Sequence, residues 1–142
     1  MTVTELRARI AAVPDATVAP TPEMLAGIEA AVHYLESDAA IASLAVDTYW
    51  PKWASPWWQM VTLWELGEVR RIPARVVRAM VDGLNALPLH IFPIQPDEWP
   101  PNANRSRDVS CHCALGSMDQ VLTACGVDVD AELPWVKPWF ER

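Results

Sequence analysis

The stretch SPWWQMVTLWELGEVRRIPARVVRAMVDGL, residues 55–84, predicts two helices joined by a tight turn. Ser55-Pro56 is a typical helix start, because proline is tolerated in the first turn. Gly67 supplies the left-handed backbone conformation that ends many helices, and Ile72-Pro73 opens the next one. Apolar residues recur at helical spacing in both segments, namely Trp57, Met60, Val61 and Trp64, then Val77, Met80, Leu84 and Leu87.

The same pattern recurs further along the chain. QVLTACG ends at Gly126, and Leu133-Pro134 then opens another short segment. Two copies of helix, glycine, loop, apolar-proline and helix predict stacked antiparallel helix pairs, each covering the apolar face of its neighbour. The alternative is that any two amphipathic helices with glycine stops look alike. No segment alternates as a strand would, so we predict an all-α fold.

Three further helices are predicted before residue 50. Thr2 and Glu5 form a capping-box pattern for a short helix that stops at Pro14. Thr21-Pro22 starts a second, and Asp38 caps a third. We therefore predict one helical domain with N-terminal helices over 1–49, a helix pair over 50–87, a proline-rich loop over 88–110 and a second pair, incomplete, over 111–142.

The overall charge argues against nucleic acid as a partner. A formal charge of −7 and a pI near 4.8 disfavour nucleic-acid binding, which depends on basic patches. The exception is a group of four arginines within nine residues, Arg70, Arg71, Arg75 and Arg78. This arginine stripe is either a solvated outer face or a surface that binds an anion or an acidic partner. No apolar run is long enough to span a membrane, and no signal peptide is recognisable, so we expect a cytoplasmic protein with reduced thiols.

These helices resemble those of α/α-toroid proteins. The resemblance covers residues 50–142 and rests on SPWWQMVTLWELG, IPARVVRAMVDGL, CHCALGSMDQVLTACG and LPWVKPWF. That group includes the terpenoid cyclases, the protein prenyltransferase β-subunits and uncharacterised bacterial relatives, and it implies a partial α/α toroid. The DxDD, DDxxD and QxxDGxW motifs of the cyclases are absent, so the resemblance does not imply terpene cyclisation.

The resemblance also suggests where a site would lie. Prenyltransferases hold a catalytic zinc with Asp, Cys and His near the ends of inner helices. Cys111-His112-Cys113 offers similar ligand types at a helix start, although no position matches that motif residue by residue. A closed ring needs about five or six helix pairs, and this chain supplies about three. We therefore expect a second copy or a separate subunit to complete the ring; alternatively, the last segment folds back on its own core.

The cysteine-bearing helix has an apolar face and an unexplained start. Five residues share one helical face: Cys111, Leu115, Met118, Leu122 and Cys125. His112 and Cys113 lie off that face near the helix N-terminus, where the helix dipole favours a thiolate. Cys111, His112 and Cys113 would bind a metal such as zinc only if the first turn is distorted. A reactive Cys113 and a purely structural role are the alternatives.

The loop before this helix carries further polar candidates. Five prolines within residues 88–110 forbid a continuous helix, and loops of this length in compact domains are usually functional or disordered. The loop would bring His90, Arg107 and Asp108 to the start of the cysteine helix. In the alternative, Arg107 and Asp108 only pair with each other and cap it.

The tryptophans have two interpretations. YWPKWASPWW, residues 49–58, predicts an aromatic turn that folds onto the following helix. Such a cluster is either core or the wall of a cavity for an apolar or cationic ligand.

Two functions of different classes follow. The first is an enzyme, or half of one, that acts on an apolar or aromatic small molecule. His112, Cys113 and Asp108 would be catalytic, and zinc at Cys111, His112 and Cys113 is an option. Trp57, Trp58, Trp64, His90 and Arg107 would bind the substrate. The second is a non-catalytic helical interaction module whose aromatic end and arginine stripe bind a partner protein.

Overall fold

The computed structural model describes residue 5, residues 19–86 and residues 112–137, and it confirms the predicted all-α fold. These ranges contain six α-helices and two short 3₁₀ helices, with no strand: α2 (Pro22–Leu35), α3 (Asp38–Val46), η1 (Lys52–Ala54), α4 (Pro56–Glu65), η2 (Val69–Arg71), α5 (Ala74–Ala86), α6 (His112–Ala124) and α7 (Val129–Glu132). The helix predicted before Pro14 lies outside the described residues apart from Glu5.

Of the helix starts predicted at Thr21-Pro22, Asp38 and Ser55-Pro56, the first and the last are confirmed. The Thr21 hydroxyl accepts a hydrogen bond from the Met24 backbone N–H at 3.2 Å, and Pro22 is the first residue of α2. Likewise, α4 begins at Pro56. The cap predicted at Asp38 is wrong, because Ser37 caps α3 by accepting from the Ala40 N–H at 3.2 Å. Asp38 is the first helical residue, where its carboxylate complements the helix dipole.

The two predicted glycine turns have the same geometry. Gly67 (φ +77°) and Gly126 (φ +87°) both adopt the left-handed conformation. The N–H of each glycine and the N–H that follows it bond back to the last helical turn, at 3.0 and 2.7 Å in the first copy and at 2.9 and 3.0 Å in the second. This pair of bonds is the Schellman motif. Each turn continues into a short helix and then a buried residue before a proline, Ile72 or Leu133.

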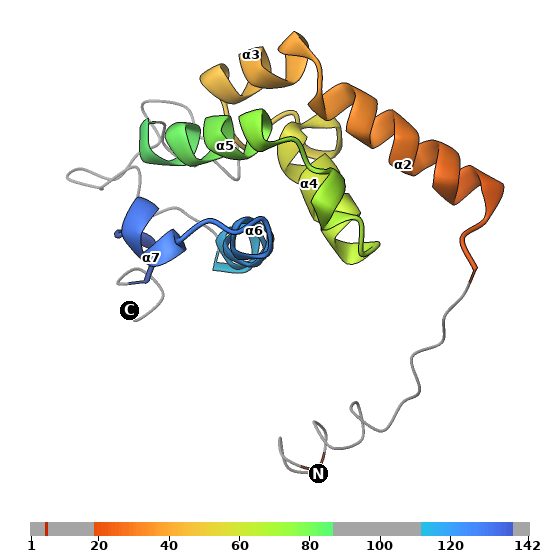
Figure 1. The fold of residues 1–142 in the computed structure, drawn as a ribbon. Helices are drawn as coiled ribbons and strands as arrows, with labels where there is room; N and C mark the ends of the chain where they lie inside the picture. The colour runs from red at the N-terminus through yellow and green to blue at the C-terminus, as the bar shows by residue number, and fades with distance from the viewer. Residues whose placement is uncertain (1–4, 6–18, 87–111, 138–142) are drawn as a thin grey trace.

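Helix α4 is the centre of the bundle (Figure 1). It packs on α2, α3 and α6, whereas α5 packs mainly on α3 and α7 packs on α6. The core draws its largest fully buried side chains from α2 to α6 and from the loop after α7: Leu35, Leu44, Trp57, Met60, Leu63, Met80, Leu115, Met118, Leu122 and Leu133. The partial toroid therefore stays a prediction, while the all-helical core is established.

The buried faces of two helices differ from the predicted stripes. On α5, Val76 is fully buried and Val77 is only half-buried, because Val76, Met80 and Leu84 recur at the four-residue spacing that faces α3 and the core. Leu87 lies outside the described residues. On α2, Leu25 is 48% exposed, because the first turns of α2 project away from the other helices (Figure 1).

The last described segment folds back on the chain's own core. Leu133 and Val136 are buried, and the Trp135 indole N–H donates to the Asn85 side-chain oxygen of α5 at 3.1 Å. This arrangement matches the alternative to ring completion for residues 129–137, while Trp139 and Phe140 lie outside the described residues. None of the helices in the described ranges is long and apolar enough to cross a membrane.

Candidate binding site

The predicted site residues divide into those that the structure describes and those that it does not. His90, Arg107, Asp108 and Cys111 lie outside the described residues. His112 is the first residue of α6, and Cys113 is exposed on its first turn. No group of three His, Cys, Asp or Glu side chains capable of holding a metal occurs in the ranges that are described. The catalytic and zinc assignments therefore stay predictions.

The apolar face predicted on α6 is confirmed where it is described. Leu115, Met118 and Leu122 are almost fully buried, and Cys125 is half-buried. Burial raises the pKa of the Cys125 thiol above its ordinary value, so this thiol is held in its less reactive protonated form. Cys125 is part of the core, as its place on the stripe predicted.

Five aromatic side chains gather at the start of α4 and form what we call the aromatic cluster: Tyr49, Trp50, Trp53, Trp57 and Trp58. The Tyr49 ring lies 5.8, 5.4 and 6.0 Å from the rings of Trp50, Trp57 and Trp58, each time edge to face. The Trp53 ring packs on the Trp58 ring at a tilt, with 4.6 Å between the ring centres. Edge-to-face contacts at these distances are favourable beyond the area they bury. The predicted aromatic turn is thereby confirmed.

Local hydrogen bonds fold this turn onto α4. The Asp47 carboxylate accepts from the backbone N–H groups of Tyr49 and Trp50 at 2.8 and 2.9 Å. The Ser55 hydroxyl donates to the Lys52 carbonyl at 2.8 Å, and the Trp50–Pro51 peptide bond is cis. The ammonium group of Lys52 lies 4.7 Å from the centre of the exposed Trp53 ring, in a cation–π contact. Hydrogen bonds within this short segment, together with the bond from the Gln59 side chain to the Trp53 carbonyl at 3.2 Å, therefore help to hold the cluster against α4.

The aromatic cluster contains buried polar groups without partners. The indole nitrogens of Trp50, Trp57 and Trp58 are covered by protein and make no hydrogen bond to any residue in the described ranges, and the same holds for the neighbouring Thr48 hydroxyl. Buried donors nearly always have an acceptor in folded proteins, and each unpaired one costs about 1–3 kcal/mol. Three such indoles around one tyrosine ring are therefore the most unusual chemical feature of the described residues.

An apolar groove lies between α3 and α5, and one of its lining residues, Gly83, packs against Thr48. The groove has a volume of about 250 Å³ and is lined mainly by apolar side chains of Ile41, Leu44, Ala45, Ala79 and Ala86, with Asp82 and Gly83. A Cβ atom at Gly83 would lie 2.6 Å from the Thr48 methyl carbon, so glycine is needed for this close approach. Thr48, which precedes Tyr49 in the chain, thus packs against a residue that lines the groove.

The predicted substrate-binding tryptophans separate in the structure. Trp57 and Trp58 belong to the aromatic cluster, but among the described residues no ring contact joins Trp64 to it. Trp64 is half-buried one to two turns further along α4. The sequence did not single out Thr48 and Tyr49, although Tyr49 is the ring on which the cluster is centred. Its place at the head of the aromatic run was the available signal.

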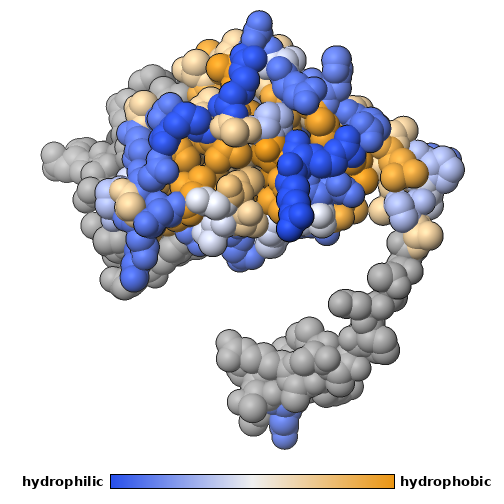
Figure 2. Space-filling model, viewed as in Figure 1, coloured by the Kyte–Doolittle hydropathy of each residue, from blue (hydrophilic) through white to orange (hydrophobic). Residues whose placement is uncertain are grey.

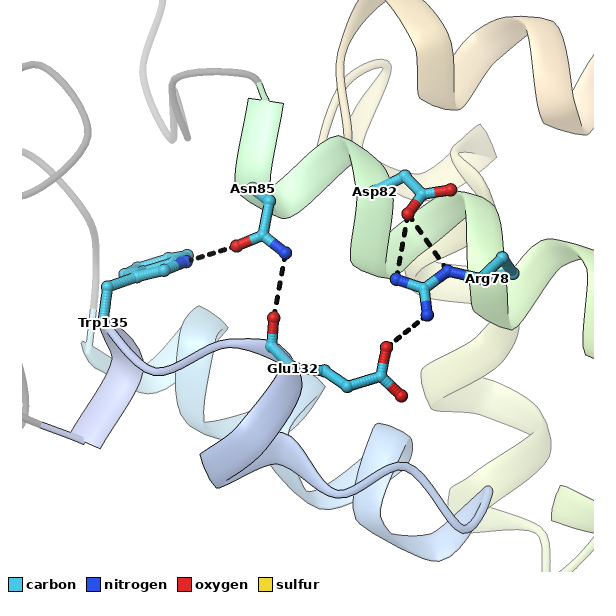
Figure 3. Close-up of polar contacts among 5 residues, drawn as sticks. All are labelled: Arg78, Asp82, Asn85, Glu132 and Trp135. Atoms are coloured by element: carbon cyan, nitrogen blue, oxygen red, sulfur yellow. Dashed lines mark hydrogen bonds and ion pairs between the residues drawn. The ribbon is translucent and has the colours of Figure 1, made fainter.

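The arginine stripe, in contrast, is engaged within the chain. Arg71 pairs with Glu29 of α2 at 2.7 Å, Arg75 with Asp38 of α3 at 2.5 Å, and Arg78 with Asp82 at 2.9 Å. Arg78 also bonds to Glu132 of α7, whose backbone carbonyl accepts from Asn85 at 2.9 Å (Figure 3). We call these pairs the arginine side.

The arginine side is exposed and electrostatically satisfied. Figure 2 shows hydrophilic side chains crossing a largely apolar face of the helices. The hydrogen bond from Arg71 lowers the pKa of Glu29, and the same bond raises the pKa of Arg71. The arginine stripe is thus solvated, as predicted. Its ion pairs also connect α5 and η2 to α2, α3 and α7. A partner surface built on these three arginines stays a prediction.

Comparison with known proteins finds no matching family model, no matching curated protein and no matching solved structure. The resemblance to α/α toroids therefore stays a prediction.

Proposed function

We propose that this chain is a helical binding module that holds an apolar or aromatic small molecule at its aromatic cluster. The observation that carries the proposal is the set of three buried indole N–H groups without acceptors around Tyr49. A purely structural aromatic core would bury rings just as well with phenylalanine, without unpaired donors. A ligand that accepts hydrogen bonds would remove this cost.

Two further features support a binding role. The rings are held in fixed edge-to-face contacts by the Asp47 and Ser55 hydrogen bonds, so the ordering cost of forming the site is already met by folding. The α3–α5 groove, one of whose lining residues packs against Thr48, has an apolar lining and a volume just below the usual range for ligand pockets, which suits a molecule with one ring.

The catalytic hypothesis would use the same ligand. Helix α6, which begins with His112 and Cys113, packs on α4, which carries Trp57 and Trp58. A molecule held at the aromatic cluster would then be a substrate if His112, Cys113 and Asp108 perform chemistry. Binding at the cluster is the part that the two functions share, and it can be tested alone.

The test is an NMR titration of protein labelled with ¹⁵N at the indole nitrogens. Acetophenone and α-methylstyrene are suitable probes of one shape, since they differ only in a carbonyl oxygen against a methylene group. A probe of about nine heavy atoms that gains about 0.5 kcal/mol per atom binds with a Kd near 1 mM. We expect the Trp57 and Trp58 indole signals to shift in a saturable manner.

The control is the tryptophan outside the cluster. The Trp64 signal should stay in place, and Trp64→Phe should bind the probes like the unmodified protein. If no probe shifts the Trp50, Trp57 or Trp58 signals up to about 10 mM, where binding is weaker than about 3 kcal/mol, the proposed function is wrong.

A further inference from the structure

We infer that the ligand of the aromatic cluster is an uncharged carbonyl compound, with an unsaturated or aromatic body and a ketone, ester or amide oxygen. The inference rests on the proposed function and adds the chemical class of the ligand. The carbonyl oxygen would accept hydrogen bonds from the indole N–H groups that have no partner among the described residues.

The direction of the hydrogen bonds follows from the indole group. An indole N–H donates and never accepts, so three indoles can be satisfied only by acceptor atoms on the ligand. Trp57 is fully buried, and the indole nitrogens of Trp50 and Trp58 are buried although parts of their rings reach the surface. A carbonyl oxygen has two lone pairs, accepts and carries no donor of its own. An amine ligand would bring donors to a site that already has too many.

The charges around the cluster favour a neutral ligand. Asp47 lies on one side, where its carboxylate holds the Tyr49 and Trp50 backbone N–H groups. Lys52 lies at the exposed Trp53 ring on the rim. The two charges are opposite, and the three arginines of the arginine side already bind acids of this chain. A carboxylate among neutral donors would lose its hydration without a paired cation, which costs far more than burying a carbonyl.

The ring geometry favours a flat body. Tyr49 meets three tryptophans edge to face with ring centres 5.4–6.0 Å apart, so the cluster is built from flat rings packed on one another. A planar unsaturated group can continue this packing, whereas a bulky saturated group cannot approach the indole edges as closely.

Three probes of similar shape separate the alternatives. Acetophenone carries a neutral carbonyl, α-methylstyrene has a methylene in its place, and benzoate carries a charge. We expect acetophenone to bind about fivefold more tightly than α-methylstyrene for each hydrogen bond gained. Benzoate should bind more weakly than acetophenone. The indole protons of the donors used should move downfield with acetophenone and not with α-methylstyrene.

Each outcome has one meaning. If α-methylstyrene binds as tightly as acetophenone, the carbonyl inference is overturned while the proposed function stands. If benzoate binds most tightly, the neutral class is wrong. If none of the three binds, the proposed function itself fails.

Variants locate the donor. Trp58→Phe keeps an aromatic ring and removes the N–H at a half-buried position, so the preference for acetophenone should fall about fivefold if Trp58 donates. Trp57→Phe tests the second donor, and Trp64→Phe is the matched control outside the cluster. Where Trp57→Phe fails to fold, the indole proton shifts of the unmodified protein decide. Unchanged preference in both cluster variants, with unshifted indole protons, would overturn the inference.

Discussion

On the arginine side, guanidinium groups that water could satisfy each bind a carboxylate of another helix. At the aromatic cluster, in contrast, three buried indole N–H groups find no acceptor among the described residues. Exposed ion pairs contribute little to stability, whereas a buried N–H group without an acceptor lowers it appreciably. The arginine side therefore has a structural role, since it ties α5 and η2 to α2, α3 and α7. The cluster retains a cost that folding alone does not explain.

The largest effect on stability is expected at Gly83 of α5, which packs against Thr48 next to the aromatic cluster. Gly83→Ala places a Cβ atom 2.6 Å from the Thr48 methyl carbon and 3.2 Å from the Leu44 carbonyl oxygen. This overpacking should lower the free energy of unfolding by about 1–3 kcal/mol in urea denaturation. The control is Gly27→Ala on α2, where nothing lies within 4 Å and alanine should stabilise the helix. Equal behaviour of the two variants would contradict the close approach of α5 to Thr48.

The second prediction is a gain of stability at Thr48. Thr48→Val replaces a buried hydroxyl without a partner by a methyl group of the same shape. We expect the ligand-free protein to gain about 1 kcal/mol of stability, because an unsatisfied polar group is removed. Thr62→Val is the matched control, since the Thr62 hydroxyl donates to the Trp58 carbonyl at 2.8 Å on the exposed side. A loss of stability in Thr48→Val would show that this hydroxyl has a partner.

A smaller effect is expected at the centre of the arginine side. Arg78→Met removes the contacts to Asp82 and Glu132 and keeps an apolar stem (Figure 3). The loss of stability should be smaller than that of Gly83→Ala and should fade in 1 M salt, where the screening length is about 3 Å. Arg70→Met should change nothing, because no ion pair of Arg70 is found in the described ranges. A loss that persists in high salt would point to packing instead of charge.

The smallest effect depends on pH. Glu29 has a pKa below its ordinary value of 4.5, mainly because Arg71 donates a hydrogen bond to it. A lowered folded-state pKa stabilises the fold above pH 4.5 and loses this contribution as the pH falls through the folded-state pKa. Glu29→Gln should therefore lower stability slightly at neutral pH and match the unmodified protein in acid. Denaturation curves that differ equally at both pH values would contradict this linkage.

Helix starts and ends could be predicted from the sequence, because their causes are local. Thr21-Pro22, Ser55-Pro56, Gly67 and Gly126 each act on a backbone a few residues away. The cap predicted at Asp38 was wrong by one residue, because the neighbouring Ser37 can also cap the helix. The arginine pairs join residues 42, 37 and 54 positions apart, and no helical period reveals such partners.

The candidate site was predictable only in part. The density of tryptophans in residues 49–58 identified the aromatic turn, and Trp57 and Trp58 were correctly placed in one cluster. Trp64 shares their helix but not their ring contacts, because the turn that carries Tyr49 and Trp53 folds against the start of α4 alone. Whether a buried N–H finds an acceptor depends on the whole packing around it, and no sequence pattern encodes that.

The most direct measurement is the acetophenone titration of protein labelled at its indole nitrogens. We predict that the Trp57 and Trp58 signals move together along one saturable curve, with their indole protons shifting downfield, while the Trp64 signal stays in place. Stationary Trp57 and Trp58 signals, or a Trp64 signal that moves as far as they do, would contradict binding through the unpaired donors of the aromatic cluster.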